Sequence, residues 1–106
     1  MKVLIVEPGQ NPRPAEIENS LEAKQAVVGG LIEMVVPPVH PDDAVLICNE
    51  EGKLLGLDSN RPIRLEDGTP YDVICGTFLI CRAPADSEEF DGLTDSQVEL
   101  YSEMYS

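Results

Sequence analysis

The chain has 106 residues and a mass of 11.6 kDa, which suits one domain built around a single hydrophobic core; two smaller domains would have to be held by disulfides. Its 20 acidic and 7 basic residues give a net charge of −13 at pH 7, which argues against direct binding to nucleic acid or to an anionic membrane, because both need a cationic surface. No apolar run approaches the roughly 20 residues of a membrane span, and no signal peptide is recognised. The three cysteines are an odd set without C-x-x-C spacing, which indicates a reducing compartment, so we expect a cytoplasmic protein.

The N-terminal part is predicted to form a strand and then a helix. Residues Lys2–Val6 (KVLIV) are apolar on both sides, which is typical of a central strand covered on both faces. Three prolines from residue 8 to residue 14 then predict a stretch without regular structure. The helix is predicted to start at Asn19, which with Glu22 has the spacing of a capping box, and to end at the Gly29-Gly30 pair. Lys24 lies on its apolar side, so we expect the stem to pack and the charge to reach solvent.

Two more strands and a hairpin are predicted in the middle of the chain. Leu31–Val36 (LIEMVV) and Ala44–Cys48 (AVLIC) have the apolar content of strands, and the second is apolar on both faces. A turn containing Gly52 follows, and Lys53–Leu57 is predicted to return as a fourth strand. Asp58–Pro70 is polar and interrupted by proline and glycine, which predicts a loop.

The C-terminal part is predicted to hold a strand, an acidic linker and a helix. Tyr71–Arg82 reads as one or two short strands broken at Gly76, with Thr77–Cys81 the clearer one. Residues 83–93 form the linker, and Thr94 with Gln97 has the spacing of a second capping box, which predicts the start of the helix. The seven acidic residues after residue 82, with no basic one, form either an ordinary solvated face or a surface that binds a partner.

These elements predict an α+β fold. We expect a mostly antiparallel sheet of about five strands with one N-terminal and one C-terminal helix, both on one face, in a single domain covering residues 1–106. The expected core consists of Val3, Ile5, Leu21, Val28, Ile32, Met34, Leu46, Ile47, Leu55, Phe78 and Ile80.

The sequence contains no assembled catalytic or metal-binding motif. His40 is the only histidine, and nothing near it in the sequence would orient it for nucleophilic catalysis. Cys48, Cys75 and Cys81 lie in apolar runs without C-x-x-C spacing, so we expect buried, reduced thiols rather than metal or redox chemistry. The acidic pairs match no calcium loop, and no glycine-rich loop precedes a helix. We therefore predict no catalytic residue, no metal site and no cofactor.

One stretch gathers amide and basic side chains in an otherwise acidic chain. An anionic ligand or a partner carboxylate is a candidate for binding there. The alternative is internal: the arginines pair with Glu66, Asp67 or the acidic tail, and the amide caps a turn. The candidate ligand-binding residues are Asn49, Lys53, Asn60, Arg61 and Arg64.

Several segments together resemble a known family. They are KVLIVEPG, LEAKQAVVGGLIEMV, ICNEEGKLLGLDSNR, DVICGTFLIC and FDGLTDSQ, and they extend from Lys2 to about Gln97. The chain resembles domain-of-unknown-function family 3846, with Lys24 standing where an apolar residue is usual. The resemblance implies a small protein carried by bacteria, phages and mobile elements, without an established activity or catalytic residues, and it favours accessory or counter-defence roles.

We expect a non-enzymatic cytosolic accessory protein that acts by binding another protein, without direct nucleic-acid or membrane binding. The alternative is a module that binds a small anionic ligand, such as a nucleotide, through Lys53, Asn60 and Arg61. Self-association into a homo-oligomer is compatible with either.

Overall fold

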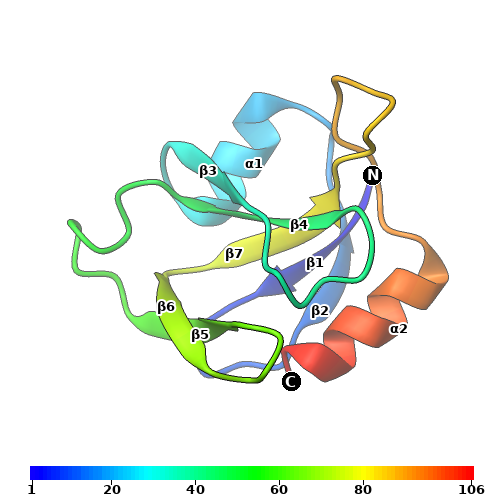
Figure 1. The fold of residues 1–106 in the computed structure, drawn as a ribbon. Helices are drawn as coiled ribbons and strands as arrows, with labels where there is room; N and C mark the ends of the chain where they lie inside the picture. Colours follow the sequence, from blue (N-terminus) through cyan, green and yellow to red (C-terminus); the bar gives the residue numbers. More distant parts are fainter.

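Five strands pair into one antiparallel sheet, in the order β2-β1-β7-β4-β3 (Figure 1). The computed structural model describes residues 1–106. The sheet consists of β1 (Lys2–Val6), β2 (Arg13–Glu16), β3 (Ile32–Val35), β4 (Ala44–Asn49) and β7 (Phe78–Arg82). A separate two-stranded sheet consists of β5 (Ser59–Arg64) and β6 (Pro70–Cys75), and the helices are α1 (Leu21–Val28) and α2 (Asp95–Met104). The predicted α+β fold with an antiparallel sheet and one helix near each end is confirmed.

The central strands give the five-stranded sheet two apolar faces. On β1, Val3 and Ile5 belong to one buried cluster, and Leu4 and Val6 belong to the other. Val27 of α1 packs against the first cluster, while residues of the β5–β6 hairpin and of α2 belong to the second. The helices therefore cover opposite faces, and the expectation of both on one face was wrong. A sheet that is apolar on both sides needs a cover on each.

The first helix begins one residue later than the capping pattern predicted. Ser20, not Asn19, is the N-cap, and its hydroxyl accepts a hydrogen bond from the N–H of Ala23. Gly29 ends the helix with a φ of 80°, a left-handed conformation that glycine adopts without strain. Lys24 is buried rather than extended into solvent, because its ammonium group donates to the side chain of Asn19 and to the carbonyl of Ser20.

The proline-rich segment after β1 contains a strand that the sequence did not predict. Arg13–Glu16 pairs along β1, with Pro14 opposite Leu4. This strand lies at the edge of the sheet. Proline is tolerated there because one side of an edge strand has no ladder hydrogen bonds to make.

The predicted hairpin strand Lys53–Leu57 was wrong. The segment coils on itself through local bonds, including Leu55 N–H to the carbonyl of Glu51 and Leu57 N–H to the carbonyl of Gly52. The reason is tertiary: β4 already has β3 on one edge and β7 on the other, so no edge is left for a hairpin partner.

The predicted loop Asp58–Pro70 was also wrong. It contributes β5 and the first residue of β6, and the paired strands bring Ile63 and Ile74 into the core. The turn is Glu66 to Thr69, where Gly68 has a φ of 88°. An Asp-Gly pair is a recognised hairpin signal, so this turn was detectable in the sequence.

The core matches the prediction in the central strands and departs from it at the periphery. The correctly predicted buried residues are Val3, Ile5, Val28, Leu46, Ile47, Phe78 and Ile80. Leu21, Met34 and Leu55 are instead about half exposed, and Ile32 is partly buried. Two of these four lie on β3, an edge strand.

The C-terminal helix begins as predicted. The Thr94 hydroxyl accepts from the N–H of Gln97, and the Gln97 side chain accepts from the N–H of Thr94, which completes the capping box. Residues 83–93 form no helix or strand. Asp91 alone makes an isolated bridge, to Arg82 at the end of β7. Neither helix has the length and apolar content needed to cross a membrane.

Candidate functional site

The five candidate residues do not form one site, because the fold separates them into two places. Asn49 and Lys53 line a groove between β3, β6 and the segment after β4. Arg61 and Arg64 line a second cavity, beside the C-terminal end of α2. Asn60 lines neither.

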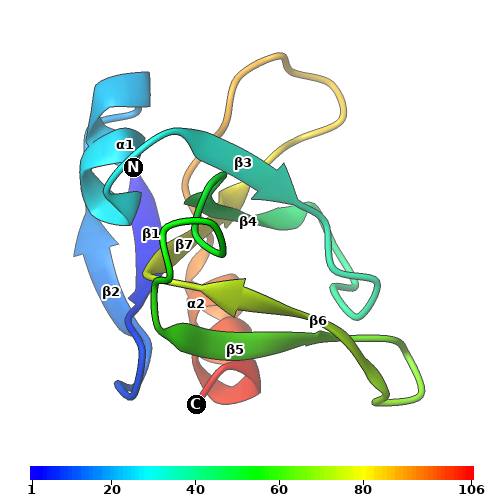
Figure 2. The same ribbon diagram turned by 90° about the vertical axis from the view of Figure 1, so that its left-hand side faces the viewer.

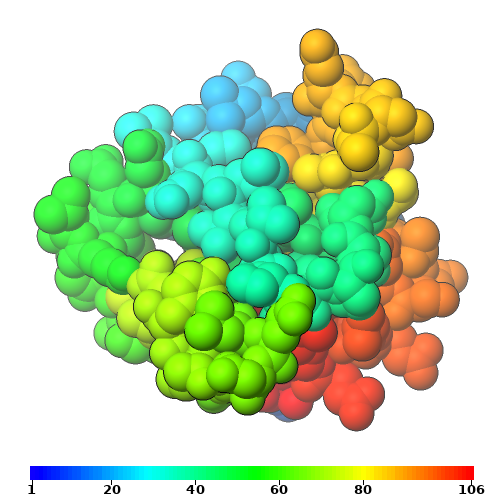
Figure 3. Space-filling model, viewed as in Figure 1, coloured from blue at the N-terminus to red at the C-terminus, as the bar shows by residue number.

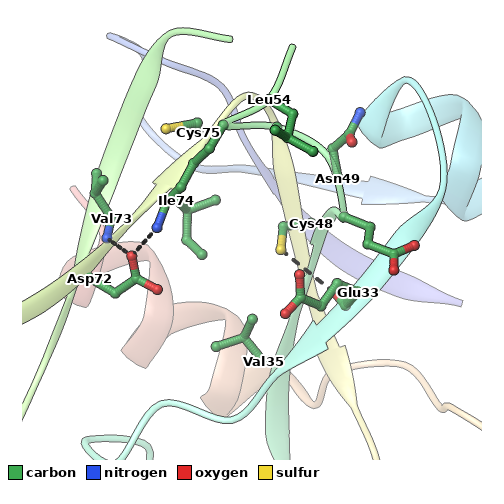
Figure 4. A pocket seen from close by; sticks show the side chains of 12 residues that line it. Glu33, Val35, Cys48, Asn49, Leu54, Asp72, Val73, Ile74 and Cys75 are labelled. Atoms are coloured by element: carbon green, nitrogen blue, oxygen red, sulfur yellow. Dashed lines mark hydrogen bonds and ion pairs between the residues drawn. The ribbon is translucent and has the colours of Figure 1, made fainter. Parts of the chain in front are cut away.

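The first place, which we call the β3–β6 groove, is a cavity of about 190 Å³, and six of its 12 lining residues are apolar (Figure 4). Figure 2 shows the coil after β4 lying between β3 and the β5–β6 hairpin. The lining includes the side chains of Val35, Cys48, Leu54, Val73, Ile74 and Cys75. Pockets that bind drug-sized ligands measure about 300–1,000 Å³, so this groove has room for a single side chain rather than for a whole cofactor.

Three carboxylates belong to the polar half of the lining. Glu33, Glu50 and Asp72 belong to the groove, and Lys53 is its only basic residue. Lys53 forms an ion pair with Asp72, and this contact lowers the pKa of the Asp72 carboxyl. Glu33 and Glu50 have no ion-pair partner. The groove therefore has an excess of negative charge.

Asn49 has a structural role at one end of the groove. Its side chain is buried, donates to the carbonyl of Val28 at 3.2 Å and accepts from the N–H of Glu51 at 2.8 Å. It thus ties the end of α1 to the turn after β4. Gly30 lies so close that an added Cβ would come within 2.9 Å of the Asn49 amide.

Exposed apolar side chains lie on the segments that form the groove. Leu54 is 86% exposed, and Leu55 is 59% exposed, on the coil after β4. Leu31, Met34 and Val36, on and beside β3, are each about half exposed or more. Figure 3 shows the coil, β3 and β6 on one face of the molecule, around a hollow.

The second place, which we call the α2–hairpin cavity, measures about 290 Å³. Arg61 closes one side of it and is held by carbonyl oxygens: Nε donates to Tyr105 at 2.8 Å and Nη2 donates to Gln10 at 2.5 Å. Its Nη1 also donates to the Asn60 side chain at 2.8 Å. Arg64 makes one hydrogen bond, from Nη1 to the carbonyl of Gly68.

Neither arginine pairs with a carboxylate, contrary to the internal pairing considered from the sequence. Four of the seven basic residues form ion pairs, but Arg61 and Arg64 are not among them. Asn60 is likewise bonded internally, since its amide donates to the carbonyls of Val6 and Gly76 at 2.9 Å. Arg61 and Asn60 therefore fasten the hairpin to β1 and to α2.

His40 joins a partly buried polar cluster that sequence reasoning missed. Its Nδ1 lies 2.7 Å from the carbonyl of Ala44, and its Nε2 lies 2.6 Å from the hydroxyl of Tyr105. Burial lowers the pKa of His40, which favours the neutral ring. Tyr101 stacks against this ring at 4.5 Å and donates its hydroxyl to Asp42. The proline-rich loop gave no sign of the two tyrosines, which are more than 60 residues away in the chain.

The cysteines are free thiols. Burial raises the pKa of Cys48 to about 11 and that of Cys81 to about 12, so both are poor nucleophiles. Cys75 is only partly buried and lies in the wall of the β3–β6 groove, so the expectation of burial holds for two of the three. No cluster of three or more histidine, cysteine, aspartate or glutamate side chains is arranged to hold a metal ion.

The fold and these two cavities define a small α+β protein with a sheet covered differently on its two faces. Residues 1–106, the whole chain, match the family described as Domain of unknown function (DUF3846), so the chain belongs to that family. The resemblance noted in the sequence is thereby confirmed. No curated protein and no solved structure matches the chain.

Proposed function

We propose that this protein acts by binding another protein through the β3–β6 groove. The observation that carries the proposal is the combination of unpaired Glu33 and Glu50 with a half-apolar lining and exposed leucines on the neighbouring coil. Contiguous exposed apolar surface with a polar rim is typical of protein interaction sites.

The proposed occupant is an extended segment of a partner that carries basic and apolar side chains. An extended segment suits β3, an edge strand whose outer side has no strand beside it. A basic side chain suits the groove, because its volume fits one side chain and its charge is negative. Apolar side chains on the same segment would cover Leu54 and Leu55.

A binding role without catalysis is supported by the hydrogen bonding of the histidine and the raised pKa values of two cysteines. Both ring nitrogens of His40 already have partners, and the thiols of Cys48 and Cys81 have raised pKa values. A cytosolic accessory role in bacteria, phages or mobile elements, with counter-defence among such roles, remains part of this proposal and depends on the family to which the chain belongs.

The test compares variants in an affinity capture from lysate of the cells that encode the protein. We expect one partner to be retained by the wild type and lost by a Leu54→Ala, Leu55→Ala double variant and by an E33Q, E50Q double variant. Leu100→Ala is the matched control, because Leu100 is an exposed leucine on α2, outside the groove. The variants should melt like the wild type, since all changed side chains are at the surface.

Two results would contradict the proposal. One is a partner that both double variants retain as well as the wild type does. The other is loss of the partner in Leu100→Ala to the same extent, which would move the interface to α2.

A further inference from the structure

The α2–hairpin cavity contains the two arginines that lack a carboxylate partner. The chain has nearly three acidic residues for each basic one, so a basic side chain finds an acidic partner easily. Lys2, Arg13, Lys53 and Arg82 have all done so. Arg61 and Arg64 line one cavity, and Glu66 is the only acidic residue in its lining. The side chains of its lining therefore carry two positive charges and one negative charge, in a protein of charge −13.

The two arginines are prepared differently for a ligand. Arg61 is fixed by hydrogen bonds to Tyr105, Gln10 and Asn60, so its plane is held in place before any ligand arrives. Arg64 uses one of its five N–H groups on Gly68 and keeps the others free. A guanidinium with free N–H groups forms paired hydrogen bonds with a phosphate or a carboxylate.

The rest of the lining includes apolar side chains that can contact a small apolar group attached to the anion. Pro62 and Leu65 come from the hairpin, and Met104 and Tyr105 come from the end of α2. The volume of about 290 Å³ lies just below the range of about 300–1,000 Å³ for drug-sized ligands, so the cavity suits a smaller molecule. The carbonyl of Tyr105, at the negative end of α2, is already occupied by Arg61 and so repels an anion less.

We infer that the α2–hairpin cavity binds a small organic anion, a phosphate or carboxylate group carried on a compact apolar ring. Arg64 donates hydrogen bonds to the anion, and Arg61 contributes its positive charge from a fixed position. Met104 and Pro62 contact the ring. This site is separate from the β3–β6 groove and does not depend on the function proposed for that groove.

Titration calorimetry of the full chain with three probes tests the inference. Phenyl phosphate and benzoate carry the two anions on the same ring, and phenol carries the ring without an anion. We expect saturable binding of at least one of the two anions and none of phenol. Which anion binds more tightly tells phosphate from carboxylate recognition.

Three single substitutions test whether an anion binds in this cavity, and none of them removes a hydrogen bond of Arg61. Arg64→Ala should weaken binding about tenfold or more, because it removes charge-assisted hydrogen bonds. Glu66→Gln should strengthen binding, since it removes the only acidic side chain of the lining. Arg13→Ala is the control, because Arg13 is paired with Glu7 outside this cavity, and it should leave the affinity unchanged.

The inference is overturned if neither anion binds at low ionic strength. It is equally overturned if an anion binds but Arg64→Ala and Glu66→Gln leave its affinity as in the wild type. Arg61→Ala is not used here, because loss of Arg61 is expected to loosen the fold itself.

Discussion

Phe78 lies fully buried in β7, where its ring meets that of Tyr105 edge-on with centroids 5.8 Å apart. Truncation leaves a cavity on the face of the sheet that α2 covers. We expect Phe78→Ala to lower the free energy of unfolding by about 3–5 kcal/mol. Urea denaturation measures the change, and Leu54→Ala, at an 86% exposed side chain, should stay within about 0.5 kcal/mol of the wild type. A Phe78→Ala protein as stable as the wild type would contradict this packing.

Arg61 is a second residue whose role the structure assigns to the fold. Three segments far apart in the chain meet at its guanidinium, through Tyr105, Gln10 and Asn60. Arg61→Ala should therefore lower stability by about 1–3 kcal/mol, since several acceptors lose a charged donor at once.

Thermal or urea unfolding measures this effect, with Arg13→Ala as the matched control at an exposed ion pair, which should change stability by less than about 1 kcal/mol. Equal stabilities of the two arginine variants would show that the carbonyl contacts of Arg61 contribute little.

At the scale of elements, α2 is attached to the sheet through polar as well as apolar contacts. Its Tyr101 donates to Asp42, and Gln97 donates to Asp43. Tyr105, the residue that ends the helix, shares a hydrogen bond with His40. The loop before β4 and the last helix thus stabilise each other across the chain.

This attachment makes stability depend on pH near neutrality. The pKa of His40 is lowered in the folded protein by burial, so the unfolded chain binds the proton more readily. The stabilising effect is fully present above the ordinary histidine value of about 6.5 and is lost as the pH falls from there toward the folded pKa. We expect the free energy of unfolding to decrease over that window.

A His40→Gln variant, which can still form hydrogen bonds, should lose this slope between about pH 5 and pH 7. Burial alone would raise the pKa of Asp42, but hydrogen bonds from Tyr101 and Ala44 outweigh it and leave the pKa lowered from 3.8. The stability due to Asp42 is lost only at lower pH, so it does not mask the histidine effect. A wild type and variant with the same slope near pH 6 would contradict the role of His40.

Capping residues in the sequence predicted the ends of the helices where only one residue could serve as the cap. The reciprocal capping box of Thr94 and Gln97 predicted the start of α2, and Gly29 predicted the end of α1. At the start of α1, Asn19 and Ser20 are both good N-cap residues, and the sequence does not choose between them. The structure selects Ser20, because Asn19 donates to the carbonyl of Phe90 and accepts from Lys24.

At the scale of the whole molecule, the charge of −13 acts on a body measuring 33 × 32 × 24 Å. The screening length is about 30 Å at 0.01 M salt and about 10 Å at 0.1 M, so at low salt the acidic groups repel one another across the entire protein. Self-repulsion destabilises the compact state. We expect the melting temperature to rise by several degrees between these two salt concentrations.

Scanning calorimetry in sodium chloride measures this shift, and the uncharged osmolyte sorbitol at matched osmolarity is the control for effects other than screening. A melting temperature that is constant or falls with salt would mean that local ion pairs, such as Lys2 with Asp95, outweigh the general repulsion.

The candidate site was only partly predictable from the sequence. The cluster of amide and basic residues was visible, but its division between two cavities was not. Arg61 and Arg64 lie on β5, in a hairpin that the sequence did not predict, whereas Lys53 lies on the coil after β4. The acidic character of the groove depends on Glu33 and Asp72, which come from different strands. Such a meeting of distant residues leaves no local signal.

The sequence alone determined the α+β class, the buried central strands β1, β4 and β7, the end of α1 and the start of α2. These depend on short-range causes: apolar runs that must be buried, glycine that tolerates positive φ, and side chains that cap a helix. Tertiary structure alone decided the pairing of the strands, and with it the rest. Because β4 takes β3 and β7 as its neighbours, Lys53–Leu57 cannot pair and its leucines remain exposed, while the hairpin after it covers the free face of the sheet.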